Sequence, residues 1–228
     1  MCEGWLWRIG RMVDAGATDF GIEASMLKMR GSDLAMKISD EAVQLHGGYG
    51  YCQDYRVERL MRDAKITQIW EGTNQIHRAI LRMLDPVEFE TFLRDLGGEV
   101  AEILRVDAVK LVLESVQNDN DPAVQRLGAV LSVAEPGFID RYLTQERGGT
   151  VRQVTLRSVQ DASEQIYGAN AEWIRSEACL KLDFGAGRLP GMLVLGAEDP
   201  HMFGAQQGTD LLVFFTGVFE RTMRRWLS

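Results

Sequence analysis

The sequence QLHGGYGY at residues 44–51, followed by RDAKITQIWEGTNQIHR at residues 62–78, decides how the rest of the chain is interpreted. Gly47 and Gly48 favour the end of a helix, because glycine adopts the backbone conformations that stop one. The second stretch joins a run of charged residues to a single carboxylate and a Gly-Thr-Asn-Gln segment. We expect the chemistry of this chain to lie in these two stretches, because they carry its most specific combination of groups.

Glu71 is the residue in these stretches that is best suited to proton transfer. It lies between the indole of Trp70 and Gly72, and desolvation beside an apolar ring raises the pKa of a carboxyl group. A carboxylate with a raised pKa can act as a general base near neutral pH. Gly72 lets a ligand approach the backbone closely, and Thr73 and Gln75 offer a hydroxyl and an amide to a polar cofactor. An isolated glutamate would instead be interpreted as a solvated residue that favours a helix start.

These motifs, in this order, resemble the C-terminal end of acyl-CoA dehydrogenases, the flavoenzymes that oxidise acyl-CoA thioesters. The resemblance runs over residues 3–84 and also includes EASMLK at residues 23–28 and VERLMRDAKI at residues 57–66. It implies a segment of an antiparallel helical bundle, FAD as the cofactor and an acyl-CoA as the substrate. The N-terminal helical domain, the middle β domain and the first part of the C-terminal bundle of that family have no counterpart in this sequence. We therefore expect no activity from the chain alone.

The same resemblance implies a role for each residue of the two stretches. Glu71 would be the catalytic base that removes the α-proton of the thioester, and its backbone N–H would help to polarise the thioester carbonyl. Gly72 would contact the substrate. Two groups of residues would bind the cofactor. The first would hold the adenylate side of FAD from a neighbouring subunit and consists of Gln44, Leu45, His46, Gly47 and Gly48. The second would contact the flavin and consists of Thr73, Asn74 and Gln75.

Other polar residues favour structural roles. Arg62, Asp63 and Lys65 are interpreted as a structural charge network rather than as catalytic groups. The sequence Asp-Pro-His at residues 199–201 is more typical of a turn than of a base or a ligand contact. The three histidines are too dispersed for a metal site, and no other group of ligands accompanies them.

The composition is that of an ordinary globular protein, with 46% hydrophobic and 25% charged residues. The net charge of −8 argues against non-specific nucleic-acid binding, which needs a basic surface. Acidity is concentrated in the second part: residues 1–85 contain 11 Lys/Arg and 12 Asp/Glu, and the remainder contains 14 and 21. Three scattered cysteines fit a reducing cytoplasm. The N-terminus is too charged for a signal peptide or a membrane span.

Helices are predicted throughout the first part, over residues 3–15, 20–46, 57–64 and 73–84. Thr18 or Asp19, Asp54 and Thr73 are candidate caps. The second helix is apolar on two sides, which is typical of a helix buried in a bundle. Because the remaining helices can cover only one side well, we predict a homo-oligomer through residues 20–46, with a weaker seam on the last helix. The two apolar stripes are Ile22, Met26 and Met29, and Leu27, Leu34, Ile38 and Leu45.

The second part is predicted to be an α+β domain. Strands are expected at residues 108–114, 129–134, 151–156, 173–182 and 192–197, the last two as an antiparallel pair. Helices are expected at residues 87–104, 136–143, 162–167 and 206–227. Trp173, beside Arg175, is interpreted as a core tryptophan at a strand start in preference to a pocket residue, and the phenylalanines of the last helix as core or a dimer seam.

Three stretches of this part resemble a proteobacterial GAF-like domain family of unknown function. They are DLGGEVAEILRVDAVKLVLES at residues 95–115, WIRSEACLKLD at residues 173–183 and GMLVLGAEDPHMFGAQQGTDLL at residues 191–212. The resemblance runs from about residue 89 to the C-terminus, without the helical N-terminal extension usual in that family. It implies an unknown small ligand or a role in dimerisation. We therefore predict two domains, residues 1–85 and 86–228.

Two hypotheses of function follow from these resemblances. The first is a segment of an FAD-dependent acyl-CoA dehydrogenase, and the second is a non-catalytic GAF-like module for ligand binding or dimerisation. A third interpretation is a fused or misassembled reading frame in which neither function is intact. Bound flavin, with its visible absorbance, would distinguish the first hypothesis from the other two.

Overall fold

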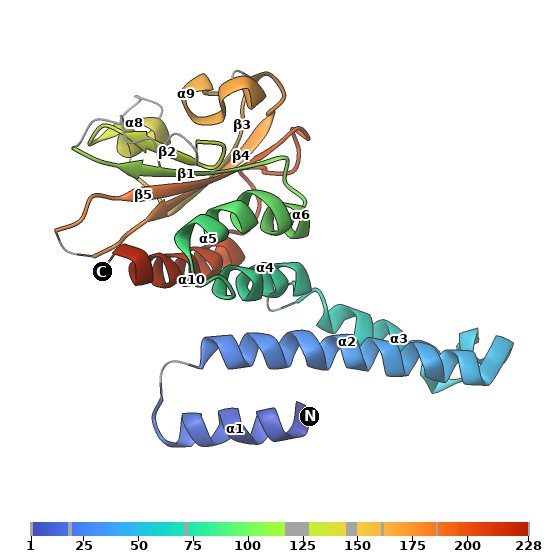
Figure 1. Cartoon of the computed structure of the whole chain (residues 1–228). Helices are drawn as coiled ribbons and strands as arrows, with labels where there is room; N and C mark the ends of the chain where they lie inside the picture. The colour runs from blue at the N-terminus through green and yellow to red at the C-terminus, as the bar shows by residue number, and fades with distance from the viewer. Residues whose placement is uncertain are drawn as a thin grey trace. The chain divides into compact units, whose positions relative to one another are not determined.

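The computed structural model describes residues 2–17, 20–70, 73–116, 128–144, 150–160, 162–185 and 187–227. The chain divides into two compact units, Met1–Leu81 and Arg82–Ser228. The described part of the first unit is helical, and that of the second combines helices with one sheet (Figure 1). The predicted order of a helical segment followed by an α+β region is confirmed.

The helices of the first part are α1 (Cys2–Asp14), α2 (Gly21–His46), α3 (Arg56–Thr67) and α4 (Asn74–Leu84), with the 3₁₀ helix η1 (Gly47–Tyr51) after α2. Each lies within a few residues of its predicted range. Helix α4 begins in the first unit and ends in the second. In the part of the chain that the structure describes, no helix is both long and apolar enough to cross a membrane.

Glycines end α2, as the sequence predicts. Gly47 has a φ of +56° and its N–H donates to Gln44 O. A Cβ atom added to Gly50 would lie 2.5 Å from Val43 O, so η1 folds tightly against the end of α2. The glycine-rich stretch therefore turns the chain back toward α3.

The predicted helix caps have different outcomes. Thr73 caps α4, because its Oγ1 accepts a hydrogen bond from Ile76 N at 3.5 Å. The prediction for Asp54 is wrong: Tyr55 precedes α3 and no side chain caps this helix. Thr18 and Asp19 lie outside the described residues.

The helix predicted at residues 87–104 contains a π-turn. It consists of α5 (Phe89–Asp95), the π-helix η2 (Leu96–Val100) and α6 (Ala101–Leu104). A side chain at Gly97 would have no space, since an added Cβ would lie 2.4 Å from Val130 Cγ2. Arg105, with a φ of +58°, ends the helical run before the first strand.

A mixed sheet of five strands forms the centre of the second unit, in the order β2-β1-β5-β4-β3. The strands are β1 (Ala108–Glu114), β2 (Leu131–Ala134), β3 (Val154–Ser158), β4 (Ser176–Leu182) and β5 (Gly191–Ala197). Strand β2 runs parallel to β1, and the other neighbours are antiparallel. The five predicted strands and the β4–β5 pair are confirmed, with ends that differ by up to three residues.

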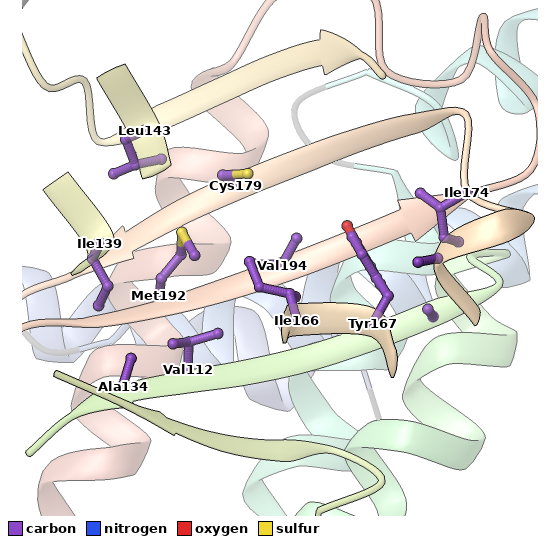
Figure 2. Packing of buried hydrophobic residues seen from close by; sticks show 12 residues of the cluster. Val112, Ala134, Ile139, Leu143, Ile166, Tyr167, Ile174, Cys179, Met192 and Val194 are labelled. Atoms are coloured by element: carbon purple, nitrogen blue, oxygen red, sulfur yellow. The ribbon is translucent and has the colours of Figure 1, made fainter. Parts of the chain in front are cut away.

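Helices cover both faces of this sheet (Figure 1). On one face lie α8 (Phe138–Thr144), α9 (Glu164–Tyr167) and the 3₁₀ helix η3 (Gly168–Glu172). Figure 2 shows their side chains pointing toward the strands, with Ile139, Ile166 and Tyr167 beside Met192 and Val194. The 3₁₀ helix η3 directly precedes Trp173, where the sequence predicted the start of a strand. Trp173 is 63% exposed, so the prediction that it lies in the core is wrong.

The last helix, α10 (Asp210–Leu227), packs on the opposite face together with α5. Phe215, Phe219 and Met223 have no exposed surface. The rings of Phe92 and Phe219 are 5.6 Å apart, and those of Phe92 and Trp226 are 4.7 Å apart. The buried members of the phenylalanine stripe therefore belong to the core of this unit.

Candidate functional site

The two residues with the most specific predicted roles, Glu71 and Gly72, lie outside the described residues. The structure does describe the segments on either side of them. Trp70 follows the end of α3 and is exposed. Thr73 directly precedes α4 and is half-buried.

The first group of predicted cofactor-binding residues lies at the C-terminal end of α2 and the start of η1. These side chains and glycines are exposed, and Leu45 has 87% of its surface accessible. His46 Nδ1 lies 2.8 Å from Ala42 O, which leaves Nε2 directed away from the helix backbone. The group therefore presents an amide, an imidazole and a glycine-rich backbone to its surroundings: Gln44, Leu45, His46, Gly47 and Gly48.

Aromatic rings surround this end of α2. The ring centroids of His46 and Tyr55 are 6.1 Å apart, and those of Tyr49 and Tyr55 are 5.7 Å apart. Tyr49 and Tyr51 are also exposed. Exposed aromatic groups beside a glycine turn are suited to pack against a planar ligand or a partner chain.

The second group lies at the N-terminal end of α4. Thr73 is half-buried and uses its hydroxyl to cap the helix, and Gln75 is exposed. Asn74 differs from both, since only 3% of its surface is exposed. Of the three residues, Gln75 is the one whose side chain is accessible to a ligand.

The two groups are not brought together within one chain. Asn74 contacts the middle of α2 at Ser32, whereas the first group begins near His46. The 14 residues between Ser32 and His46 correspond to about 21 Å along an α-helix. A single small ligand group cannot contact both sets in the same copy.

Asn74 belongs to a buried polar network with α2. Its Nδ2 donates to Ser32 Oγ at 2.9 Å and to Asp33 Oδ1 at 2.9 Å. Its Oδ1 accepts from Lys28 Nζ at 3.1 Å. Sequence reasoning missed this network, because the partners are more than 40 residues away along the chain.

Asp33 is the centre of the same network. Gln68 Nε2 donates to its Oδ1 at 2.7 Å, and Arg78 pairs with its Oδ2 at 2.8 Å. Partial burial alone would raise the pKa of Asp33, but the hydrogen bonds from Arg78, Gln68 and Asn74 hold it below its ordinary value. Asp33 is therefore an ionised carboxylate that joins three helices or helix ends.

The charged run on α3 forms short-range pairs at the surface. Arg62 pairs with Glu58 at 2.8 Å, and Asp63 lies 3.7 Å from Arg59. Lys65 donates to Gln68 Oε1 at 3.0 Å. These contacts confirm the structural interpretation of Arg62, Asp63 and Lys65.

A groove of about 510 Å³ lies between α1 and α2. Its apolar lining includes Trp5, Met26 and Met29, and Arg30 and Lys37 are among its polar residues. The sequence had one signal for it, the apolar stripe of Ile22, Met26 and Met29 on α2.

A second polar network is buried under the helices of the α+β unit. Glu177 of β4 has no exposed surface, and its carboxylate accepts hydrogen bonds from Tyr142 at 2.7 Å, Tyr167 at 2.8 Å and Arg157 at 2.6 Å. Burial, together with the neighbouring carboxylate, raises the pKa of both tyrosines, so they stay protonated as donors. Every oxygen of Glu177 is thus engaged within the fold, and the network holds α8 and α9 on the sheet.

The segment at residues 199–201 is a turn. Asp199 Oδ1 accepts a hydrogen bond from His201 N at 2.8 Å, and Asp199 O accepts from Ser176 Oγ at 2.5 Å. The His201 side chain is exposed. The turn interpretation is confirmed. Within the described ranges, no three potential metal-ligating side chains form a cluster.

Two family models match this chain. Residues 2–83 match "Acyl-CoA dehydrogenase, C-terminal domain" and residues 55–228 match "Protein of unknown function, DUF484". The predicted resemblance of the first part to acyl-CoA dehydrogenases is confirmed, and so is that of the second part to a family of unknown function. The second match begins well before residue 89, the expected start, and therefore takes in α3 and α4. Residues 55–83 are common to both matches.

Curated relatives match only the first part of the chain. An acyl-CoA dehydrogenase from Bacillus subtilis (strain 168) is 62% identical over 61 residues, which are 27% of this chain and 16% of the relative. Cyclohexane-1-carbonyl-CoA dehydrogenase from Geobacter metallireducens is 50% identical over 79 residues, 35% of this chain and 20% of the relative. The human mitochondrial very long-chain specific acyl-CoA dehydrogenase is 42% identical over 96 residues, 42% of this chain and 15% of the relative. The chain thus spans a fifth or less of the length of these relatives.

Proposed function

This chain belongs to the DUF484 family of proteins of unknown function, and from this premise we propose that it joins an acyl-CoA dehydrogenase-like helical segment to a GAF-like α+β domain. The helical segment derives from an FAD-dependent enzyme that oxidises acyl-CoA thioesters. By itself it does not carry out that reaction.

The observation that supports this proposal is the extent of the similarity. It is strong over about the first 80 residues, yet it covers a fifth or less of the relatives. Hydride transfer from a thioester to a flavin requires the reacting atoms to lie about 3–3.5 Å apart. The part of the relatives that matches this chain supplies only one side of such an arrangement.

Within this proposal the site residues keep the roles of the resembling family. Glu71 is the catalytic base and Gly72 a substrate contact. The two groups of cofactor-binding residues lie about 21 Å apart along α2. This separation supports contacts of the two groups with two different FAD molecules, or with one FAD that is shared between subunits. The cofactor-binding set is Gln44, Leu45, His46, Gly47, Gly48, Thr73, Asn74 and Gln75.

The three cysteines, Cys2, Cys52 and Cys179, are free thiols, which supports a cytoplasmic location.

Turnover by the purified chain tests the first part of the proposal. The full chain is mixed with FAD, butyryl-CoA or octanoyl-CoA and an electron acceptor, and bound flavin is followed by its visible absorbance. We expect no oxidation of either thioester. Turnover that Glu71→Gln abolishes and the exposed control Glu41→Gln retains would refute the proposal.

A non-catalytic role for the α+β domain is the second candidate function. It is favoured by the match of DUF484 to most of the chain and by the well-packed sheet in its second unit. The engaged carboxylate of Glu177 argues against ligand binding beneath α8 and α9, because that layer is filled by its own side chains. Calorimetric titration with nucleotides and acyl-CoA tests the ligand-binding alternative.

A further inference from the structure

Helix α10 has an outward face whose centre is a glycine. Phe215 and Phe219, on its inner side, have no exposed surface. Gly217 lies midway between them in sequence, and at 3.6 residues per turn it falls on the opposite side of the helix from both. A Cβ atom added to Gly217 would meet nothing within 4 Å. The described part of the unit therefore has space for a side chain at this position.

This glycine is unexpected inside a helix. Glycine is the least favourable residue in a helix interior after proline, and Gly217 is the eighth of the 18 residues of α10. At Gly97, Gly191 and Gly196 of the same unit an added Cβ would lie less than 3 Å from a neighbouring side chain, so close packing explains each of them. Gly217 differs, and a glycine on an exposed helix face allows another backbone to approach closely. The residue is suited to the crossing point of two packed helices.

Charges of opposite sign lie at equal distances on either side of Gly217. Asp210 is seven residues before it and Arg224 seven residues after it, about 10.5 Å along the helix in each direction. Seven residues are nearly two turns, so these three residues share one face of the helix. Val213 and Arg221, four residues before and after the glycine, lie on the same face, and both charged ends and both of these residues are exposed.

This pattern is complementary to itself when it is reversed. If two such helices cross antiparallel at Gly217, Asp210 of one copy lies beside Arg224 of the other, and Val213 lies beside the aliphatic stem of Arg221. Each contact then occurs twice, as in a two-fold interface. Within one copy Asp210 and Arg224 are about 21 Å apart along the helix, so they cannot contact each other there. Arg224 Nη2 donates to Asp183 O at 3.1 Å, which engages one of the five N–H groups of the guanidinium.

We propose that two copies of the chain pair through this face of α10, antiparallel about a two-fold axis at Gly217. The pairing deepens the dimerisation role proposed for the α+β domain and rests on it. A second copy fits the face because the charges match in reverse order and the two glycines meet at the axis. The pair is weaker than the contact predicted through α2, since its centre has no large apolar side chain to bury.

Sedimentation equilibrium of the full chain at high micromolar concentration tests the pairing. The parent variant carries Leu34→Glu and Ile38→Glu, two exposed positions of α2, so that the weaker α10 pair is measured alone. Adding Gly217→Leu should raise the dimer Kd at least about tenfold, because a side chain at the crossing overpacks the contact. The matched control is Gly10→Leu, at an exposed helix glycine whose added Cβ also meets nothing, and it should leave the Kd unchanged. A monomeric parent, or equal Kd values with and without Gly217→Leu, would overturn the proposal.

Exchange of the two charges provides a second test if Gly217→Leu does not fold. Asp210→Lys and Arg224→Glu should each raise the Kd roughly threefold to tenfold, and the double variant should return it to within about threefold of the parent. The natural placement of these charges also suits the helix dipole, so a purely local role would make the double variant the worst of the three. A Kd that stays high in the double variant refutes the pair. If the wild-type chain assembles while all these variants behave as the parent, the α10 pair is wrong and the dimerisation role stands.

Discussion

Glu177 shows how this fold accommodates a charge with no exposed surface. Its neighbours are the cation Arg157 and two hydroxyl donors, Tyr142 and Tyr167. Buried charges are tolerated when a cation and hydrogen bonds compensate the lost hydration. The guanidinium also stacks over the ring of Tyr142, with its central carbon 4.5 Å from the ring centroid.

Removal of Arg157 is predicted to destabilise the α+β unit strongly. In Arg157→Met the carboxylate of Glu177 stays buried and loses its cation, which should cost about 3–5 kcal/mol. Urea unfolding followed by tryptophan fluorescence measures the change. The control Arg152→Met alters an exposed arginine before the same strand and should change the free energy of unfolding by less than about 0.5 kcal/mol. Equal losses in both variants would contradict the role of the pair.

Asp33 gives a prediction for pH. Because its pKa is lowered in the folded state, it contributes stability above its ordinary pKa of 3.8, and that contribution is lost as pH falls through the folded value. Arg78 faces this carboxylate, and Lys28 faces its partner Asn74. The stability difference between wild type and Asp33→Asn should be constant from about pH 7 to pH 5 and shrink below about pH 4. Far-UV circular dichroism with urea at each pH measures it, and a difference that grows on acidification would be inconsistent.

At the scale of elements, the C-terminal end of α4 belongs to the second compact unit. Arg82, near its C-terminal end, pairs with Asp85 at 3.1 Å, with the buried Asp95 at 3.1 Å and with Glu99 at 2.7 Å. Met83 beside it has 1% of its surface exposed. Arg82 precedes residue 86, where the sequence placed the start of the second domain, yet it pairs with Asp95 of α5 and Glu99 of η2.

Fragments with different start points test this feature. A fragment of residues 86–228 loses Arg82 and Met83, and it should be at least about 2 kcal/mol less stable than a fragment of residues 73–228. Urea denaturation of both fragments gives the difference. Arg82→Ala in the longer fragment measures the contribution of the ion pairs to stability apart from that of the buried Met83. Identical unfolding midpoints would show that α4 adds nothing to the second unit.

Periodicity and turn residues predicted most elements of this fold, whereas contacts between distant residues decided the rest. Gly47 and Gly48 signal the end of α2 locally, and the alternating apolar residues of β1 indicate a strand. The π-turn near Gly97 depends on its contact with Val130 and leaves no local signal. The family resemblance places Asn74 in the cofactor-binding set, and it gives no sign that Asp33 and Ser32, more than 40 residues earlier, engage its amide.

At the scale of the whole molecule, uncovered apolar side chains predict self-association. Leu34 and Ile38 of α2 are 47% and 59% exposed, and they belong to the stripe expected to need a partner. Burying a leucine or isoleucine side chain contributes roughly 1.5–3 kcal/mol. We expect the full chain to form a homo-oligomer in sedimentation velocity experiments, and Leu34→Glu with Ile38→Glu to shift it to monomer. Glu41→Lys, an exposed change on the same helix, should leave it assembled. A wild-type chain that stays monomeric at high micromolar concentration would refute the prediction.

The position of Arg157 on β3 has one more consequence. Strand β3 is at the edge of the sheet, and its residues Val154, Thr155 and Leu156 favour strand pairing. A charge turned inward on an edge strand hinders other chains from adding to it, because the added strand would have to bury that charge or displace it. Replacing it with an apolar residue removes this protection and leaves a short, neutral, β-prone segment. The ion pair beneath α8 thus also protects the chain against fibril growth. The thioflavin T fluorescence of Arg157→Met is expected to rise on long incubation.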